Sequence, residues 1–380
     1  MRLSGSVLRR ALLPGLVLQS VIVGGGYATG REFAEFFLAN GPLGGAFAMA
    51  IATLLISAVY ATSLEFARVH QCFEYRGFFG ALLGRGWIVF EVLYILLSVL
   101  VLSVIAATAG TVLNDFTGVA SWIGTLGFTI VTALVTALGS HQLERMMAAS
   151  ALLLMIFYFV LVIVVLGKFG GDAQAQWAMS PPPDVASSAF DGVRYAGYNL
   201  ASITATLFCA RALTSRADCI SAGLLGGVLA MAPGAFFFFG MVSFMPAILD
   251  EPAPITMILK ATGVPSFSLF FMLVLVATLV ATGAGFLHSI NERLGISRSA
   301  SSRQWSASER VVTAGALLVV SAFIAGEIGL VGLVGRGYGL ITFGFLAVFV
   351  VPILTVGWWR ILRKAEAPGD DFRTDRGAER

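Results

Sequence analysis

Ten long apolar segments follow one another along the 380-residue chain, and no soluble domain separates them. A helix needs roughly 20 mostly apolar residues to cross a bilayer, and inside the bilayer every backbone polar group must find its partner within the protein. The composition agrees, because only 12% of the residues are charged, against about a quarter in soluble domains. We therefore predict an all-α integral membrane protein with ten spanning helices, at about 11–38, 43–69, 87–113, 119–139, 145–167, 190–211, 219–247, 265–290, 310–328 and 331–359.

The distribution of Lys and Arg predicts how these helices are oriented. If the N-terminus is cytoplasmic, 19 of the 24 Lys and Arg residues belong to the inner side. Cytoplasmic connections carry the excess of these residues in membrane proteins. We therefore expect a multi-pass protein with both termini in the cytoplasm and with membrane lipid as a partner. The small net charge of +3 gives no reason to expect nucleic acid.

The reactive residue types are few and scattered. The three cysteines and three histidines show no metal-ligand spacing and no disulfide pattern. The spans contain no nucleophile–base pair at helical spacing. We therefore expect no enzyme activity, no metal site and no cofactor, apart from Na⁺ or H⁺ as a possible coupling ion.

The ten predicted spans divide into two halves of five. Because five is odd, the second half starts on the opposite side of the membrane and is inverted relative to the first. Inverted repeats of this kind are typical of secondary transporters. We predict a first repeat at 1–167, a second at 168–364 and a charged cytoplasmic tail at 365–380. The oligomeric state stays open between a monomer and a homodimer.

Corresponding helices of the two halves contain the same irregularity. Helix one is interrupted by Gly24-Gly25-Gly26, and helix six carries Gly197 and Asn199 near its centre. Paired breaks of this kind indicate a binding site, since freed amides can bind a carboxylate and freed carbonyls can bind a cation. Close helix packing is the alternative for a single glycine cluster, but the coincidence of the two breaks favours a site.

The motif between Gly24 and Phe37 resembles the YkvI-like family of bacterial inner-membrane proteins. A glycine-rich break, an aromatic residue, Ala-Thr-Gly, a polar residue and Glu carry the resemblance, together with YAGYNLA at 195–201 in helix six. That family is grouped with the amino acid–polyamine–organocation superfamily. The resemblance covers the whole ten-helix chain and implies a LeuT-type five-plus-five fold, with helices one and six discontinuous, in the bacterial inner membrane. It implies a transporter but no particular substrate.

The resemblance also implies where a coupling ion would bind. Sodium-coupled LeuT-like members hold one ion between the break in helix one and hydroxyls on helix eight. Thr278 and Thr282 are four residues apart and so share a helix face, and carbonyls near Val21 and Gly24 could complete the site. Gly283 stands where a second adjacent hydroxyl is usual, which leaves Na⁺ and H⁺ both open. The alternative for each threonine is a hydrogen bond to its own helix.

The charged residues beyond the glycines are gating and coupling candidates, because ionisable residues within spans are rare. Arg31 and Glu35 are four apart, so a local ion pair accompanies any gating role. Glu32 lies on another face without an evident local partner. We predict it about 10 Å above the break, in an outer vestibule, as a proton carrier or gate, or else as a cap on nearby backbone. By analogy, Arg9 and Glu292 could close an inner gate.

Several polar residues accompany the two breaks. Their presence within spans predicts that they face a central cavity, with interhelical hydrogen bonding as the alternative. The predicted substrate-binding set is Gln19, Gly24, Gly25, Gly26, Thr29, Gly197, Tyr198, Asn199 and Ser202.

Together these features predict a secondary active transporter that works by alternating access, with helices one, two, six and seven rocking against the rest. The solute would be a small amino acid-like molecule or carboxylate, because broken helix ends suit a carboxylate. A passive channel is disfavoured by the lack of charge rings or a filter motif. A membrane sensor or receptor that keeps a transporter fold without transport stays open.

Overall fold

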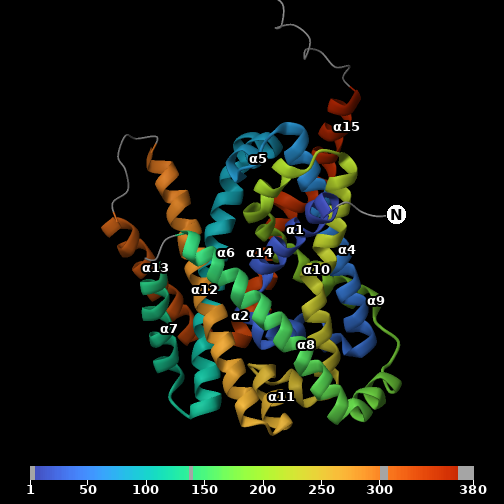
Figure 1. Ribbon diagram of the computed structural model, residues 1–380, viewed down its shortest axis with the longest axis vertical. Helices are drawn as coiled ribbons and strands as arrows, with labels where there is room; N and C mark the ends of the chain where they lie inside the picture. The colour runs from blue at the N-terminus through green and yellow to red at the C-terminus, as the bar shows by residue number, and fades with distance from the viewer. Residues whose placement is uncertain (1–4, 137–139, 300–306, 367–380) are drawn as a thin grey trace, which may run out of the picture.

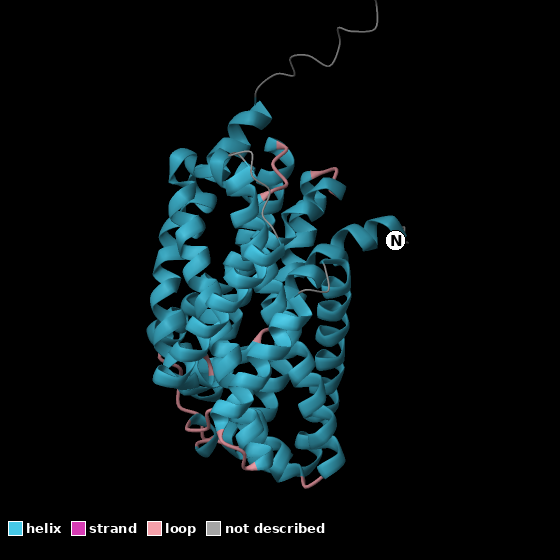
Figure 2. Ribbon diagram, turned by 90° about the vertical axis from the view of Figure 1, so that its left-hand side faces the viewer, coloured by secondary structure: helices cyan, strands magenta, loops and turns pink. Residues whose placement is uncertain are grey.

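The computed structural model describes residues 5–136, 140–299 and 307–366, and within these ranges its regular elements are all helices (Figure 2). The first predicted span is divided into α1 (Gly5–Ile22), α2 (Gly25–Thr29) and α3 (Arg31–Phe36), which the short η1 (Leu38–Asn40) follows. The rest of the first half forms α4 (Gly41–His70), α5 (Tyr75–Leu83), η2 (Gly84–Gly86), α6 (Trp87–Thr117), α7 (Ser121–Thr136) and α8 (Ser140–Ala178).

The second half begins with α9 (Val185–Asn199), which continues directly into the 3₁₀ helix η3 (Leu200–Ala212). It continues as α10 (Arg216–Val242), η4 (Ala247–Leu249), α11 (Pro254–Thr262), α12 (Pro265–Ser299) and α13 (Ala307–Gly332). The last segment alternates π-helical and α-helical turns in η5 (Leu333–Tyr338), α14 (Gly339–Phe345), η6 (Leu346–Val350), η7 (Ile353–Gly357) and α15 (Trp358–Glu366).

The described residues contain six helical stretches that are long and apolar enough to cross a membrane. The apolar helices Arg10–Ile22 and Ser121–Thr136 are shorter. The predicted count of ten spans is therefore not established by length and composition alone. The six long stretches are Arg31–His70, Tyr75–Thr117, Leu152–Ala178, Arg216–Val242, Pro265–Leu287 and Val312–Lys364.

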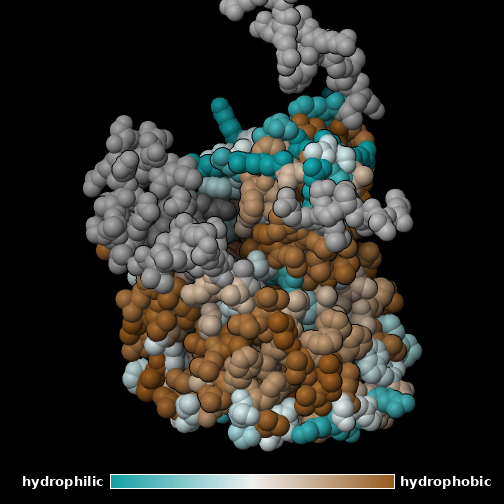
Figure 3. All heavy atoms as spheres, in the orientation of Figure 1, coloured by the Kyte–Doolittle hydropathy of each residue, from teal (hydrophilic) through white to brown (hydrophobic). Residues whose placement is uncertain are grey.

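The outer surface is apolar where a bilayer would surround it. Large hydrophobic side chains such as Leu134, Phe323 and Leu340 are 67–73% exposed. Brown apolar residues predominate in the coloured middle part of the face in Figure 3, and teal residues gather toward its ends. Soluble monomers rarely expose patches of this extent. Lipid is the solvent that makes such a surface favourable, so the chain is a multi-pass membrane protein.

Two groups of helices make up the bundle (Figure 1). In one group α4 packs on α10 and α9, and α10 also packs on α1. In the other, α6 packs on α7 and α13, while α12 packs on α7 and α8. Helix α8 also packs on α10 and so connects the two groups. The first group contains the helices that we expected to rock, and the short α2 contacts α6 of the second. The break in the first span therefore lies between the two groups.

Helix six differs from the expected interruption. We predicted a break around Gly197 and Asn199, but α9 runs through both residues and then tightens into η3 without leaving the helical region. Side-chain bonds accompany the tightening, because the hydroxyls of Thr204 and Thr206 donate to carbonyls three residues earlier, each at 2.8 Å. A 3₁₀ stretch of 13 residues is far longer than the usual three or four and marks strain or a hinge.

Candidate functional site

The break in the first span has non-helical backbone at two glycines, and one of them, Gly30, requires glycine. Gly24 is extended, with φ −121° and ψ −166°, between the last turn of α1 and the first of α2. Gly30 separates α2 from α3 with φ +82°, a left-handed conformation that glycine adopts without the Cβ penalty of other residues. A Cβ at Gly30 would also collide with the ring of Phe237. The chain therefore changes direction twice within a few residues.

The backbone groups released by the break find partners inside the protein. The Tyr158 hydroxyl on α8 donates to the carbonyl of Ala28 at 2.6 Å and to that of Tyr27 at 3.3 Å. The Thr282 hydroxyl on α12 lies 3.4 Å from the Val23 carbonyl oxygen. A buried carbonyl without a partner is costly in lipid. The break is thus held from both α8 and α12.

Glu32 turns back toward the break instead of facing a vestibule. Its side chain is only 4% exposed, and its Oε2 accepts a hydrogen bond of 2.7 Å from the Tyr198 hydroxyl. Its carboxyl also accepts from the backbone N–H of Tyr27 and lies directly against Gly26. Side chains on a helix tilt toward its N-terminus, and Glu32 is near the N-terminus of α3. Our expectation of a position about 10 Å above the break was therefore wrong.

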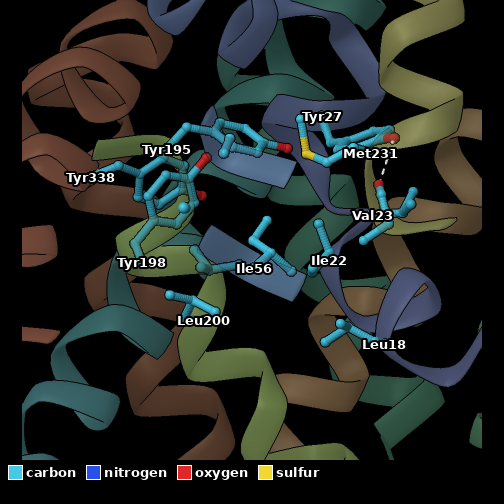
Figure 4. Packing of buried hydrophobic residues seen from close by; sticks show 14 of the residues in the cluster. Leu18, Ile22, Val23, Tyr27, Ile56, Tyr195, Tyr198, Leu200, Met231 and Tyr338 are labelled. Carbon is cyan, nitrogen blue, oxygen red and sulfur yellow. Dashed lines mark hydrogen bonds between the residues drawn. The ribbon is translucent and has the colours of Figure 1, made fainter. Parts of the chain in front are cut away.

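An aromatic cluster is centred on Tyr198, the tyrosine that hydrogen-bonds this carboxylate. The Tyr198 ring stacks on Tyr338 with centroids 4.3 Å apart and planes 15° from parallel. Tyr195 and Phe36 lie 5.8 Å and 6.0 Å from the Tyr198 ring. Figure 4 shows Tyr195, Tyr198 and Tyr338 gathered together, across from Ile22 and Val23 at the end of α1. The aromatic cluster of Phe36, Tyr195, Tyr198 and Tyr338 thus joins α3, α9 and η5, and its member Tyr198 bonds the acidic group.

Arg31 connects α3 to the segment after α10. It pairs with Glu35 at 2.8 Å, as the spacing predicts, and donates to the carbonyls of Leu249 at 2.8 Å and Glu251 at 3.1 Å. Arg194 makes a similar connection, since it pairs with Asp191 at 2.9 Å and donates to the Gly335 carbonyl. These contacts close the side of the break that α3 faces. The gating role of Arg31 and Glu35 stays a prediction.

The remaining predicted substrate residues are distributed around the break. Gly197 faces Thr342 on α14, away from the glycine triplet. The Asn199 amide donates to the Tyr195 carbonyl, and the Thr29 hydroxyl donates to the Gly26 carbonyl at 3.3 Å. Ser202 is half-buried in η3. Of the helix-six residues, Tyr198 is the one whose side chain the structure brings to Glu32.

Gln19 lines a separate, narrow cavity beside the break that has no room for a water molecule. Its amide contacts the Met155 sulfur at 3.4 Å. The cavity includes no atom of Glu32 in its lining, so the two features are distinct. The lining residues are Gln19, Val23, Tyr27, Leu154, Met155, Tyr158 and Pro233.

The predicted ion ligands separate into two environments. Thr282 contacts the break through Val23, whereas the Thr278 hydroxyl donates to Val274 of its own helix at 2.8 Å. Val21 lies in the last turn of α1. No cluster of three or more His, Cys, Asp or Glu that could hold a metal occurs among the described residues.

The predicted inner gate falls on side chains that the structure does not describe. Arg9 and Glu292 both lie outside the residues whose side chains are described. The neighbouring Arg10 donates to the Thr214 hydroxyl at 3.1 Å, so a contact between the start of α1 and the start of α10 exists on this side.

Sequence reasoning missed Tyr158 and Tyr338. Tyr158 stands in the apolar run LLLMIFYFVLV of the fifth predicted span, and a lone hydroxyl in such a run is a signal, because buried tyrosine hydroxyls usually find a partner. Tyr338 follows the Gly-Arg-Gly of η5 and carries no comparable signal. Its position beside Tyr198 depends on the packing of η5 and α14 against α9.

Comparison with solved structures identifies the fold. The chain is similar to a Na⁺-coupled sialic acid symporter, with a TM-score of 0.64 and 14% identity over 93% of this chain and 79% of the other. It is similar to the nucleobase-cation-symport-1 family transporter Mhp1, with a TM-score of 0.60 and 15% identity over 92% and 78%. It is also similar to MhsT, solved with L-phenylalanine, with a TM-score of 0.58 and 14% identity over 93% and 97%. The chain therefore has the LeuT-type fold.

No family model matches the chain, and no curated protein sequence is significantly similar to it. The similar structures are transporters and not enzymes, in agreement with the expectation that this chain is not an enzyme. At identities of 14–15% the likeness concerns the fold, and membership in the YkvI-like family stays a prediction.

Proposed function

We propose that this protein is a secondary active transporter that moves a small organic solute by alternating access. The observation that carries the proposal is the interruption of the first span between Ile22 and Gly25, with a buried carboxylate turned onto it. Non-helical backbone at membrane depth persists where it is buried in protein or lines a cavity, and in transporters it marks the binding site. The solute site lies beside α2, between α6, α9 and α12.

The remaining architecture is part of the same proposal. Ten spans form two inverted repeats, 1–167 and 168–364, with 365–380 as a cytoplasmic tail. Both termini are cytoplasmic, and the protein is a YkvI-like member of a bacterial inner membrane. The packing of α1, α4, α9 and α10 as one group supports rocking of these helices against the rest.

The coupling ion is Na⁺ or H⁺, and each has a candidate group. Thr282 with the Val23 carbonyl supplies two oxygens on opposite sides of the break, as a Na⁺ site between α1 and α12 requires. Glu32 supplies a carboxylate that could carry a proton. The Na⁺-coupled sialic acid symporter among the similar structures supports coupling to Na⁺. The burial of Glu32 supports coupling to H⁺.

Uptake into proteoliposomes tests the proposal. The purified chain is reconstituted with an imposed Na⁺ or H⁺ gradient, and labelled amino acids, amines and carboxylates are offered outside. We expect accumulation of one class against its gradient, abolished by an ionophore for one ion. Specific binding without flux under any gradient would contradict transport and favour a sensor. Flux that never exceeds equilibration would favour a channel.

A further inference from the structure

The Glu32 carboxylate has no cationic partner in the described part of the chain. It hydrogen-bonds the Tyr198 hydroxyl and the Tyr27 N–H, but no Lys, Arg or His side chain described pairs with it. Buried carboxylates are ordinarily paired, because an isolated buried charge is strongly unfavourable. Glu65, the other buried glutamate, follows this rule through Arg68 at 2.8 Å. Glu32 is the exception.

The nearby arginines are engaged elsewhere. Arg31 is the neighbour of Glu32 in the chain, but its guanidinium binds Glu35 and two carbonyls of the loop after α10. Arg194 lies one helical turn before Tyr198, and its guanidinium binds Asp191 and lies 5.2 Å from the Phe36 ring. The charge of Glu32 is therefore neutralised either by a proton or by a cation that comes from outside the chain.

The surroundings of Glu32 suit an organic cation. Aromatic rings attract cations through their π faces. The aromatic cluster supplies four rings, and its central member Tyr198 hydrogen-bonds the carboxylate. Hard divalent cations instead require six or more oxygen ligands, and no cluster of three acidic or metal-binding side chains occurs in the described residues.

We propose that the transported solute carries an ammonium group, which binds the Glu32 carboxylate within the aromatic cluster of Phe36, Tyr195, Tyr198 and Tyr338. The inference rests on the proposed transport function and narrows its substrate class. The ammonium N–H takes the place of the Tyr198 hydroxyl as donor to Oε2, and the carbon skeleton of the solute contacts the rings. A simple carboxylate is excluded from this position because it would meet a carboxylate already there.

Three probes with one skeleton test the charge requirement. The purified full chain in detergent is titrated with 2-phenylethylammonium, 2-phenylethanol and 3-phenylpropanoate, and binding is followed by calorimetry and thermal shift. We expect the ammonium alone to bind. Glu32→Gln should weaken it by at least about tenfold, because the variant loses a buried charge pair. Na⁺ alone should not produce the same Glu32-dependent shift.

Two further variants keep the test decisive. Glu65→Gln removes the other buried carboxylate, at the inner end of α4, and should leave ammonium affinity within a factor of about two, since distant sites are independent. Tyr198→Phe keeps the ring and removes the hydroxyl that competes for Oε2, so this variant should still bind the ammonium. Its result can be used even if Glu32→Gln fails to fold. Equal binding by Glu32→Gln, preferential binding of the propanoate, or loss of ammonium binding in Tyr198→Phe would overturn the inference.

The two proposals fail separately. If proteoliposomes accumulate a carboxylate and Glu32→Gln does so equally well, transport stands and the ammonium inference is wrong. If the ammonium binds through Glu32 but no solute is moved under any gradient, the inference stands and the transport proposal is wrong.

Discussion

Replacing Gly26 by alanine tests how tightly Glu32 is seated in the break. A Cβ at this position would lie 2.8 Å from Glu32 Cγ and 3.0 Å from Cδ, whereas ordinary contact begins at 3.4 Å. Glu32 Oε1 would lie closer still, so the side chain must move by at least about 0.6 Å. This is enough to disturb its 2.7 Å bond to Tyr198, because O–H···O bonds weaken beyond about 3.0 Å.

The structure also sets the expected magnitude. A hydrogen bond to a charged group contributes about 1.5–3 kcal/mol, and overpacking a filled site costs about 1–3 kcal/mol. Alanine is the better helix former by about 0.5–1 kcal/mol, which opposes both effects within α2. We expect Gly26→Ala to reduce the free energy of unfolding by about 1–3 kcal/mol and to impair uptake.

Gly24→Ala is the matched control. A Cβ there would meet only the Ile22 carbonyl oxygen, at 3.9 Å, and the extended backbone suits any residue. The apparent Tm of each purified variant in detergent and its initial rate of uptake are compared with the unaltered chain. The reasoning is refuted if Gly26→Ala is as stable and active as the unaltered protein, or if Gly24→Ala is equally damaging.

Three further changes separate local from long-range effects. Arg31→Gln removes the contacts that join α3 to the segment after α10 and should destabilise the protein by about 2–4 kcal/mol. The control Arg85→Gln, at an exposed position, should leave the stability unchanged. Equal apparent Tm values for the two variants would show that the Arg31 contacts are not needed. If Na⁺ is the coupling ion, Thr282→Val should reduce or abolish the Na⁺ dependence of uptake. Thr278→Val should retain it, because the Thr278 hydroxyl is bonded to its own helix. Identical Na⁺ titrations of the two variants would exclude the Na⁺ site. Tyr158→Phe leaves the buried Ala28 carbonyl without a donor, while the Tyr27 carbonyl keeps the Gly30 N–H. The variant should lower the free energy of unfolding by about 1–3 kcal/mol, measured by thermal unfolding in detergent, and an unchanged Tm would show that the break does not depend on Tyr158.

Local spacing was a sound guide to features that depend on neighbours in the chain. Arg31 and Glu35 are four residues apart and form the expected ion pair, because helix geometry alone brings such positions together. The glycine triplet likewise predicts the interruption at its own position, where α1 ends at Ile22 and α2 begins at Gly25.

The same reasoning was less accurate in helix six. Gly197 and Asn199 are poor helix formers, yet α9 continues through both residues. Gly197 is there to admit Thr342 of α14, a packing requirement and not a break. A glycine that permits close approach and a glycine that ends a helix look alike in the sequence, and only the neighbouring helix distinguishes them.

The sequence by itself determined that this chain is a bundle of membrane helices and that the first of them is broken by glycine. Both follow from hydropathy and backbone freedom, which are properties of single residues and short segments. Only the tertiary structure decided what lies at the break, because Tyr198 is 166 residues from Glu32 in the chain and Tyr158 reaches Ala28 from 130 residues away. The environment of the buried carboxylate is made by packing between distant helices, and that packing has no counterpart in local spacing.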